Sequence, residues 1–558
     1  MDKCEHDVVH QEHLTTDYEQ TIGQTVQSPT IPSSYFTNKL FLGSLMALGL
    51  GMFSGTASFS LIAPILPIVN ADIGPNANYT WVGLVNTLML AVGYTIVGRL
   101  SDLCGRSALV RLAASVQTSP TFLLAELIPM KQRFLATGLM YLWVVPGTVF
   151  GPAISYGFLL HTAAGWRWVY YLLIISNGLA TLCWTLFYYP PTYVMINSQS
   201  RLRMVRKFDY IGFVLFNGGL LIFLIGLSWG GSVHPWNSSY VIGTIVCGAL
   251  ALVSFVIYEH HVSIPLIPMT LFKNRAWIVC SKVMALTSSV FYGFSLISPR
   301  MVFEVYTSDL GYGSILCCAV PGGFILGIVF SALSRYIGKQ KWQVIIAAII
   351  AAPLVTSAAC ATTDNKSTVL GLSITGSFFF GYIEGVSTTG TSLTVPDQSG
   401  IGVSVGVAST MRATMATIAS TIYVVVLANR LATTVPEYVP PALLSAGLPP
   451  SSVPAFLQNY ESGIFKNIPG MTPAIIDAGT SAYRVASGTA FRTIFFTTLA
   501  FSGPTLILAV LFPNMDSKMT DEVAVLLRNK EERAAAIEAI RLERGPRENC
   551  INGQPTTV

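Results

Sequence analysis

The chain has 558 residues, of which 52% are hydrophobic and 11% are charged, and its net charge is +5. Soluble domains carry about 25% charged residues, so this composition excludes an ordinary soluble globular protein and indicates lipid as the main solvent. The positive charge is modest, and we expect it to orient loops and tails at a membrane rather than to bind nucleic acid.

Residues 1–39 are polar and mixed in charge. They lack the basic start and short apolar core of a cleavable signal peptide, so we expect a cytoplasmic tail and a first span that itself targets the chain. Nine cysteines are scattered through spans and tails, and the long loop after Arg430 holds none of them. This distribution gives no sign of a disulfide framework.

Apolar stretches of about 20 residues, the length that crosses a bilayer, recur from Phe41 to Pro513. They predict an all-helical, multi-pass membrane protein with spans near residues 41–69, 80–98, 134–160, 166–189, 209–229, 239–258, 276–299, 311–331, 342–361, 367–389, 401–429 and 490–513. Lys and Arg are concentrated in the loops near 201–207, 273–275 and 335–341, which the positive-inside rule places in the cytoplasm. The same parity places three glycosylation sequons outside, at Asn78, Asn237 and Asn365.

The segment Gly98-Arg-Leu-Ser-Asp102-Leu-Cys-Gly105-Arg106 follows the apolar stretch that ends at Val97. We interpret it as a short cytoplasmic loop, in which the glycines let two helix ends approach and Asp102 pairs with an arginine or caps a helix. It resembles the signature between the second and third spans of the major facilitator superfamily. The resemblance implies that Asp102 and Arg106 are gating groups at the cytoplasmic rim and not substrate ligands.

A second copy of this pattern, Ser331-Ala-Leu-Ser-Arg335-Tyr-Ile-Gly338-Lys339, also lies between two spans, with Arg335 at the position of Asp102. Such a repeat indicates two parallel six-helix halves, as in the major facilitator superfamily, with the spans at 209–229 and 239–258 as an inserted linking pair. We therefore expect cytoplasmic tails at 1–39 and 514–558, an N-terminal half at 40–189, a loop and linking pair at 190–260, and a C-terminal half at 261–513 that includes a partly ordered outer loop at 431–489.

The count of spans fails after the first copy of the motif. Residues 98–106 and 126–133 both belong in the cytoplasm, but one weak apolar segment, interrupted by Arg111, joins them. A single crossing cannot return to the side it left, and an arginine at mid-depth without a partner costs about 2.5 kcal/mol or more. We predict that about one and a half spans are absent near residues 106–111. A re-entrant or surface-lying segment is the alternative.

The segment Gly147-Thr-Val-Phe-Gly151-Pro152 resembles the glycine-proline motif of proton-coupled antiporters, in which small residues allow close packing and proline bends the helix. A role in packing alone would explain the same residues. Further stretches are similar to fungal transporters of the trichothecene efflux pump family, which normally have fourteen spans: 165–172, 208–213, 227–231, 309–313 with 338–341, and 439–449. This resemblance implies export of a toxin-like or drug-like metabolite in exchange for protons.

Proton coupling requires a group in the membrane that alternates between a protonated and a charged form. Glu384, within Phe380-Gly-Tyr-Ile-Glu384-Gly, is the most central carboxylate and our candidate for this role. The alternative is a glutamate near a span end that hydrogen bonds neutralise. Arg300 and Glu304, spaced i and i+4, are expected to form a structural pair. No residue is assigned as a substrate ligand.

Three functions remain open at this level. The leading one is proton-coupled efflux of small organic metabolites, toxins or drugs by a monomer in the plasma membrane, with a vacuole or vesicle membrane as the alternative. Uptake of siderophore-bound iron is a second, since related fungal carriers have a long last outer loop. A non-transporting sensor or defective isoform is the third, because of the gap near 107–128. We see no metal-ligand spacing, nucleophile elbow or phosphate loop, so we expect neither an enzyme nor a cofactor.

Overall fold

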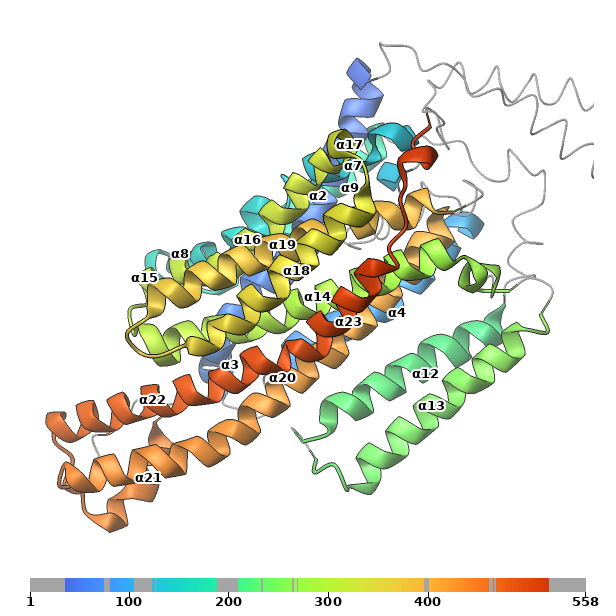
Figure 1. The fold of residues 1–558 in the computed structure, drawn as a ribbon. Helices are drawn as coiled ribbons and strands as arrows, with labels where there is room; N and C mark the ends of the chain where they lie inside the picture. Colours follow the sequence, from blue (N-terminus) through green and yellow to red (C-terminus); the bar gives the residue numbers. More distant parts are fainter. Residues whose placement is uncertain are drawn as a thin grey trace, which may run out of the picture.

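The computed structural model describes residues 36–74, 81–104, 123–125, 127–187, 209–231, 234–262, 265–267, 269–395, 401–460, 465 and 468–520. Every long element in these ranges is a helix (Figure 1). A helix satisfies its backbone hydrogen bonds within one segment, as an apolar chain in lipid requires. Ten helical stretches of the described chain are long and apolar enough to cross a membrane.

The N-terminal half begins with α2 (Lys39–Ile62) and α3 (Leu66–Ile73), which a 3-10 turn (Ala63–Ile65) joins into a nearly continuous stretch. The other helices of this half are α4 (Trp81–Cys104), α7 (Arg133–Tyr141), α8 (Gly151–His161) and α9 (Arg167–Phe187), with a π-helical turn, η4 (Val145–Val149), between α7 and α8. Helix α2 packs along α9 and against η4, whereas α4 lies mainly along a helix of the other half. In the described part of the chain, the N-terminal half therefore has helices at all four of its predicted spans. Two of them, α2 with α3 and α9, are among the ten stretches that are long and apolar enough to cross a membrane.

The C-terminal half has six spans. They are α14 (Arg275–Met301), α15 (Leu310–Cys317) with α16 (Ala319–Phe330), α18 (Gln340–Ser357), α19 (Lys366–Leu393), α20 (Ile401–Ser445), and α22 (Pro473–Thr497) with α23 (Leu499–Val510). Short turns, η6 (Val302–Tyr306), η7 (Ser331–Leu333) and α17 (Ser334–Ile337), follow α14 and α16. Helix α20 packs along α14, α22 and α4, and so joins the two halves.

The predicted linking pair is a hairpin of α12 (Tyr210–Trp229) and α13 (Ser239–Glu259). Figure 1 shows this hairpin beside the bundle, and α12 contacts α4 and α20. Asp209 caps α12, because its Oδ1 atom accepts a hydrogen bond of 2.8 Å from the Gly212 N–H. All twelve predicted spans thus coincide with described helices. The segment near 106–111, where we predict an absence, lies outside the described residues.

The outer loop expected at 431–489 is largely helical, so the expectation of a partly ordered loop was wrong. Helix α20 continues to Ser445, α22 begins at Pro473, and the short helix α21 (Val453–Asn459) confirms the helix-like stretch within it. This outer hairpin has a core of its own, with Val439, Leu443, Phe456 and Tyr483 among its buried members. Tertiary packing of that core outweighs the low helix propensity of the Pro- and Ser-rich sequence.

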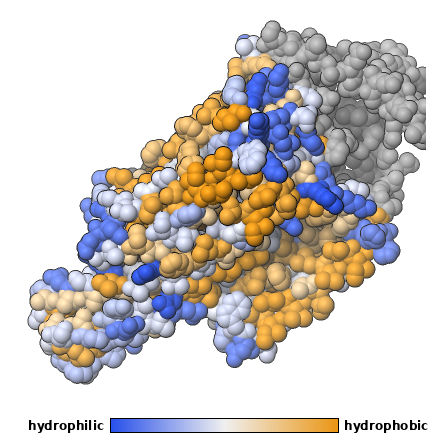
Figure 2. Space-filling model, in the orientation of Figure 1, coloured by the Kyte–Doolittle hydropathy of each residue, from blue (hydrophilic) through white to orange (hydrophobic). Residues whose placement is uncertain are grey.

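The two ends of the bundle differ in charge. We call the end that holds Lys131, Lys273 and Lys339 the inner end, and the opposite end the outer end, following the positive-inside rule. Apolar residues cover much of the side of the bundle and polar residues gather toward its ends (Figure 2). Exposed side chains such as Ile174, Ile257 and Ile507 are 60–69% accessible and belong to the surface that faces lipid.

Candidate functional site

The centre of the bundle holds a buried ion pair. The Nε atom of Arg412, on α20, lies 2.9 Å from the Oε1 atom of Glu384, on α19. The side chain of Glu384 is completely inaccessible and that of Arg412 is 12% accessible. Burial of an isolated charge at such a position would cost much free energy, and the opposite charge of the partner offsets this cost for each of the two residues.

Two hydroxyl groups of α14 complete the surroundings of the carboxylate. Thr287 donates a hydrogen bond of 2.5 Å to Oε2 of Glu384, and Ser288 donates one of 2.5 Å to Oε1. Ser288 also accepts a hydrogen bond of 2.8 Å from Nε of Arg412. Three helices of the C-terminal half therefore meet in one polar cluster, which we call the Glu384 cluster and which consists of Thr287, Ser288, Glu384 and Arg412.

The Glu384 cluster faces the interface between the halves through Arg412. The guanidinium carbon lies 5.8 Å from the centre of the Tyr292 ring, and Arg412 lines a cavity with Tyr141 of the N-terminal half. Further lining residues come from both halves, among them Thr56, Ser60, Thr148, Ser295, Phe324 and Ile328. The cavity measures about 20 Å³, which is room for about one water molecule.

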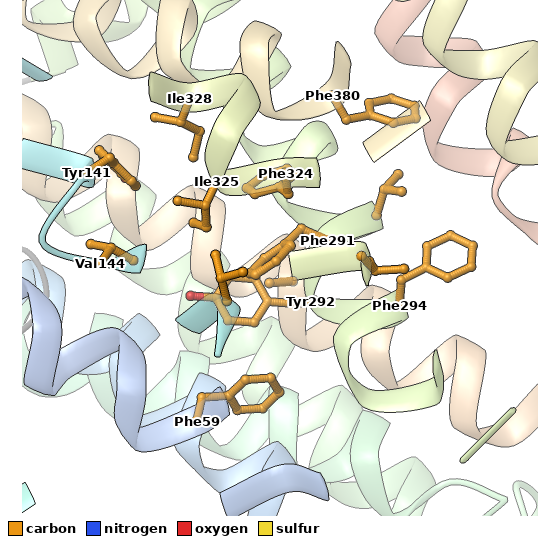
Figure 3. Packing of buried hydrophobic residues seen from close by; sticks show 14 of the residues in the cluster. Phe59, Tyr141, Val144, Phe291, Tyr292, Phe294, Phe324, Ile325, Ile328 and Phe380 are labelled. Atoms are coloured by element: carbon orange, nitrogen blue, oxygen red, sulfur yellow. The ribbon is translucent and has the colours of Figure 1, made fainter. Parts of the chain in front are cut away.

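Aromatic side chains surround this space. Phe59 of α2 packs edge to face on Tyr292 of α14 at a ring distance of 5.6 Å, and Phe291 stacks on Phe324 of α16 at 4.2 Å. Figure 3 shows Phe59 and Tyr141 on ribbons of the N-terminal half and Tyr292 and Phe324 on ribbons of the C-terminal half. Flat apolar molecules with a few oxygen atoms match a lining of aromatic rings, hydroxyls and one cation.

The inner end of the interface is closed by contacts between α7 and the C-terminal half, which we call the inner gate. Arg133 is buried, and its Nη1 atom donates a hydrogen bond of 3.0 Å to the carbonyl oxygen of Ser392. Thr389 of α19 donates one of 3.2 Å to the hydroxyl of Thr137. A Cβ atom on Gly138 would lie 2.6 Å from the Cβ of Ala332, so the backbones approach closely here.

The outer end is also closed. Tyr156 of α8 packs on Phe303 of η6 at a ring distance of 5.2 Å, and α8 lies against α15. Tyr156 is held in place by the hydrogen bond of 3.0 Å that its hydroxyl donates to the carbonyl oxygen of Pro64. With both ends closed and only a small central cavity, the described residues are in an occluded arrangement.

The antiporter-like residues Gly147, Gly151 and Pro152 lie where α7 gives way to α8. Gly147 is in the π-helical turn η4, and a Cβ atom there would lie 2.6 Å from the Cβ of Ala57 on α2. A Cβ on Gly151 would lie 2.9 Å from Oγ of Ser60, which itself donates to the Thr148 carbonyl. The small residues thus permit a close approach to α2, next to the central cavity.

The gating motif is only partly described. Helix α4 continues to Cys104, so Gly98 and Asp102 belong to its last turns and not to a loop, which corrects the interpretation of this segment. Gly105 and Arg106 lie outside the described residues. The pair expected from Arg300 and Glu304 does form, through a hydrogen bond from Nε to Oε1.

Two of the three sequons lie at the outer end. Asn237 is exposed in the turn between α12 and α13. Asn365 precedes α19, but its amide is engaged: Nδ2 donates to the Cys360 carbonyl at 2.7 Å and Oδ1 accepts from the Thr362 N–H at 2.8 Å. Asn78 lies outside the described residues.

Sequence reasoning missed Arg412. The signal was present, because an arginine inside the span at 401–429 is expensive in lipid unless a carboxylate is near, and Glu384 was already identified as the most central carboxylate. Thr287 and Ser288 gave no such signal, since hydroxyl groups are common in spans and are mostly bonded to their own helix.

Comparison with known proteins agrees with the resemblance noted in the sequence. The family model described as fungal trichothecene efflux pump (TRI12) matches residues 107–539. The trichothecene efflux pump TRI12 of Fusarium sporotrichioides is 24% identical over 88% of this chain and 89% of its own length, and that of Trichoderma arundinaceum is 25% identical over the same shares. The MFS-type transporter prx5 of Penicillium rubens is 26% identical over 91% of this chain and 97% of its own length. These relatives are transporters, and the chain has the all-helical fold of the major facilitator superfamily.

The alignment with the Fusarium protein also bears on the missing segment. It extends over 537 positions, but 88% of 558 residues is about 491, so at about 46 positions the relative has a residue and this chain has none. About 30 residues make one and a half spans. The family match begins at residue 107, immediately after Arg106. The unmatched positions are counted over the whole alignment, so they agree with an absence of this length without locating it. The absence near 106–111 stays a prediction.

Proposed function

Because this chain belongs to the fungal trichothecene efflux pump family, we propose that it exports small, largely apolar organic metabolites or toxins by exchange for protons. Its partners are then a small-molecule substrate, protons and the lipid bilayer, and the protein acts as a monomer in the plasma membrane. The observation that supports this proposal most is the Glu384 cluster, in which a fully buried carboxylate is paired with an arginine that lines the central cavity.

In this proposal Glu384 carries the proton. Protonation of its carboxylate removes the charge that holds Arg412 at 2.9 Å, so the guanidinium is released toward the cavity. Thr287 and Ser288 accompany the carboxyl group in either form, because a hydroxyl both donates and accepts hydrogen bonds. Loss of the proton on the opposite side of the membrane restores the pair. Protonation of the Glu384 carboxylate thus decides how strongly α19 and α20 are held together.

The remaining motif residues have supporting roles in the proposal. Gly147, Gly151 and Pro152 let the break between α7 and α8 lie against α2, so that the N-terminal half can bend beside the cavity. Asp102 and Arg106 act at the inner rim as gating groups. Asn237, in the turn between α12 and α13, carries a glycan. Asn78 carries a second one. At Asn365 a glycan would require the loss of the two amide hydrogen bonds, so modification there is disfavoured.

The test is transport in inside-out membrane vesicles from yeast that express the chain. A radiolabelled trichothecene is the probe, and an imposed gradient, acidic inside the vesicle, drives its accumulation. We expect accumulation to collapse when the gradient is dissipated. In Glu384→Gln we expect it to fall by about tenfold or more at equal protein level, while exchange of the probe without a gradient persists.

Glu304→Gln is the matched control. It changes the same atoms in another carboxylate of the same half, at the outer end of α14, where Glu304 pairs with Arg300. Gradient-driven accumulation that survives in Glu384→Gln but not in Glu304→Gln would overturn the assignment of the proton to Glu384. Uptake of a ferric siderophore by intact cells, without accumulation of the trichothecene, would replace export by the alternative of iron uptake.

A further inference from the structure

The chain does not leave the bundle after its last helix. Residues Asn514–Thr520, which we call the strap, run from the end of α23 across the inner end, and the short helix Asp516–Lys518 lies within them (Figure 1, red). Contacts with both halves hold the strap in place. No family motif discussed above includes these residues.

The contact with the C-terminal half centres on Asp516. Its Oδ2 atom accepts a hydrogen bond of 2.9 Å from the Lys339 N–H, and its Oδ1 atom accepts one of 2.8 Å from Nε2 of Gln340. In return, the Met515 N–H donates one of 3.1 Å to Oε1 of Gln340. Lys339 has a φ angle of 50°, a left-handed conformation that costs free energy in a non-glycine residue and that points its N–H at the carboxylate.

The contact with the N-terminal half is smaller and lies at the other end of the strap. The Lys131 N–H donates a hydrogen bond of 2.9 Å to the Thr520 carbonyl oxygen, and the Thr520 hydroxyl lies 3.4 Å from the sulfur of Met130. Lys131 and Met130 directly precede α7, the helix that forms the N-terminal side of the inner gate. The strap therefore joins the two surfaces that must separate when this gate opens.

The Met515 side chain closes the space beneath the strap. It is fully buried in a cluster that includes Met130 and Phe134 of the N-terminal half and Cys280 and Val386 of the C-terminal half. Burial of this methionine side chain stabilises the contact, because it removes apolar surface from water. The strap thus adds both hydrogen bonds and apolar contacts across the halves.

We propose that the strap is a built-in lock of the inner gate: it holds the occluded arrangement and has to detach from Lys131 before the inner end can open. Three hydrogen bonds hold it to the C-terminal half and one backbone hydrogen bond holds it to the N-terminal half, so it detaches at Thr520 and moves with the C-terminal half. Its physiological meaning rests on the transport cycle proposed above, but its effect on the gate does not depend on substrate or protons.

Two truncations separate the strap from the tail that follows it. One ends at Lys518 and removes the Thr520 contact, and the other ends at Thr520 and keeps the whole strap. Both are compared with the full chain in inside-out vesicles, each carrying Thr389→Cys in the inner gate as the reporter. An impermeant maleimide is applied from the inner side, and modification of residue 389 is read from its own peptide by mass spectrometry.

We expect the chain that ends at Lys518 to be modified about fivefold faster than the full chain or more, because it loses about one hydrogen bond and the apolar contact of Met519 with the cluster around Met515. The chain that ends at Thr520 should match the full chain. Asp516→Ala, which detaches the strap at its other end, should also raise the rate, and Asp364→Ala in an exposed outer loop is its matched control.

Equal rates in the two truncated chains would overturn the proposal, as would an unchanged rate in both the chain that ends at Lys518 and Asp516→Ala. Because the labelling needs no trichothecene and no proton gradient, a failure of the proposed transport function leaves this result readable. Conversely, a failure of the strap leaves the assignment of Glu384 untouched.

Discussion

Arg412 and Glu384 lie in different helices, 28 positions apart in sequence, and their side chains meet at 2.9 Å in the centre of the bundle. The pair ties α20, which spans the interface with α4, to α19, which forms part of the inner gate. A change of charge at the pair is therefore transmitted directly to two helices that contact the N-terminal half.

Removal of only one partner of the Arg412–Glu384 pair should lower the stability of the protein. In Arg412→Leu the buried carboxylate keeps its two hydroxyl partners but loses its counter-charge, so we expect a loss of about 3–5 kcal/mol in stability. The double variant Arg412→Leu with Glu384→Gln should recover most of it, because no charge is left behind. Thermal denaturation in detergent measures both, and a double variant no more stable than Arg412→Leu would contradict the pairing.

Helices α16 and α19 approach each other through reciprocal glycines. A Cβ atom on Gly381 would overlap the carbonyl oxygen of Phe324, and one on Gly327 would overlap that of Phe378. Because backbone atoms cannot yield as a flexible side chain can, we expect Gly381→Ala to cost about 1–3 kcal/mol. Gly371→Ala on the same helix, where nothing lies within 4 Å, should be neutral or slightly stabilising in the same denaturation assay.

The linking hairpin depends on a cap at its inner end. Asp209→Ala removes the acceptor of the Gly212 N–H, and we expect a loss of about 1 kcal/mol. Asp209→Asn keeps an oxygen at the same position and should retain most of the stability. Protection of the first turn of α12 in hydrogen exchange distinguishes the two, and equal protection in Ala and Asn would show that the cap is not needed.

The strap should be insensitive to physiological pH. Partial burial alone would raise the pKa of Asp516, but hydrogen bonds from Lys339 and Gln340 outweigh it and lower the pKa below its ordinary value of 3.8. A lowered pKa stabilises the contact above the ordinary value, and this stabilisation is lost only as the pH falls through the lowered one. Labelling of Thr389→Cys should therefore not change between about pH 5 and pH 8 through Asp516. A rise that Asp516→Asn abolishes would contradict this.

We expect a longer transcript of the same gene with an insertion between the codons of Arg106 and Arg111. It should add about 30 codons or more, the length of one and a half spans, and so complete the six spans of the N-terminal half. Sequencing of full-length cDNA checks this. If the present junction is the main product, the reading as a non-transporting sensor or defective isoform gains, and transport by this chain in vesicles decides between them.

The positions of the spans could be predicted from the sequence, because about 20 apolar residues in a row leave few alternatives in lipid. The ends of the helices were harder to predict than their positions. Helix α4 extends past Val97 to Cys104, and Gly98 of the motif did not stop it. Polar residues such as Ser101 and Asp102 carry no hydrophobic signal, so a span that continues into water as a helix is not distinguished from a loop.

The contacts of the Glu384 cluster could be predicted only in part, because a single sequence does not show which distant residues meet. Glu384 was found because a carboxylate within a span is rare, but its hydrogen bonds to Thr287 and Ser288 join residues almost 100 positions apart, and a single sequence holds no trace of that contact. The strap was invisible for a similar reason. Asp516 is one acidic residue in a polar tail, and its partners Lys339 and Gln340 lie more than 170 positions away in the sequence.

Helix α20 has 45 residues and is about 68 Å long, about twice the thickness of the hydrocarbon core. Together with α21 and the start of α22 it projects beyond the other helices at one end of the bundle (Figure 1). Small membrane proteins without such a feature are hard to orient in electron micrographs, because the surrounding detergent hides them. In this protein the outer hairpin extends beyond the detergent and marks the orientation of each particle. Images of the protein alone should therefore be alignable without a bound antibody fragment.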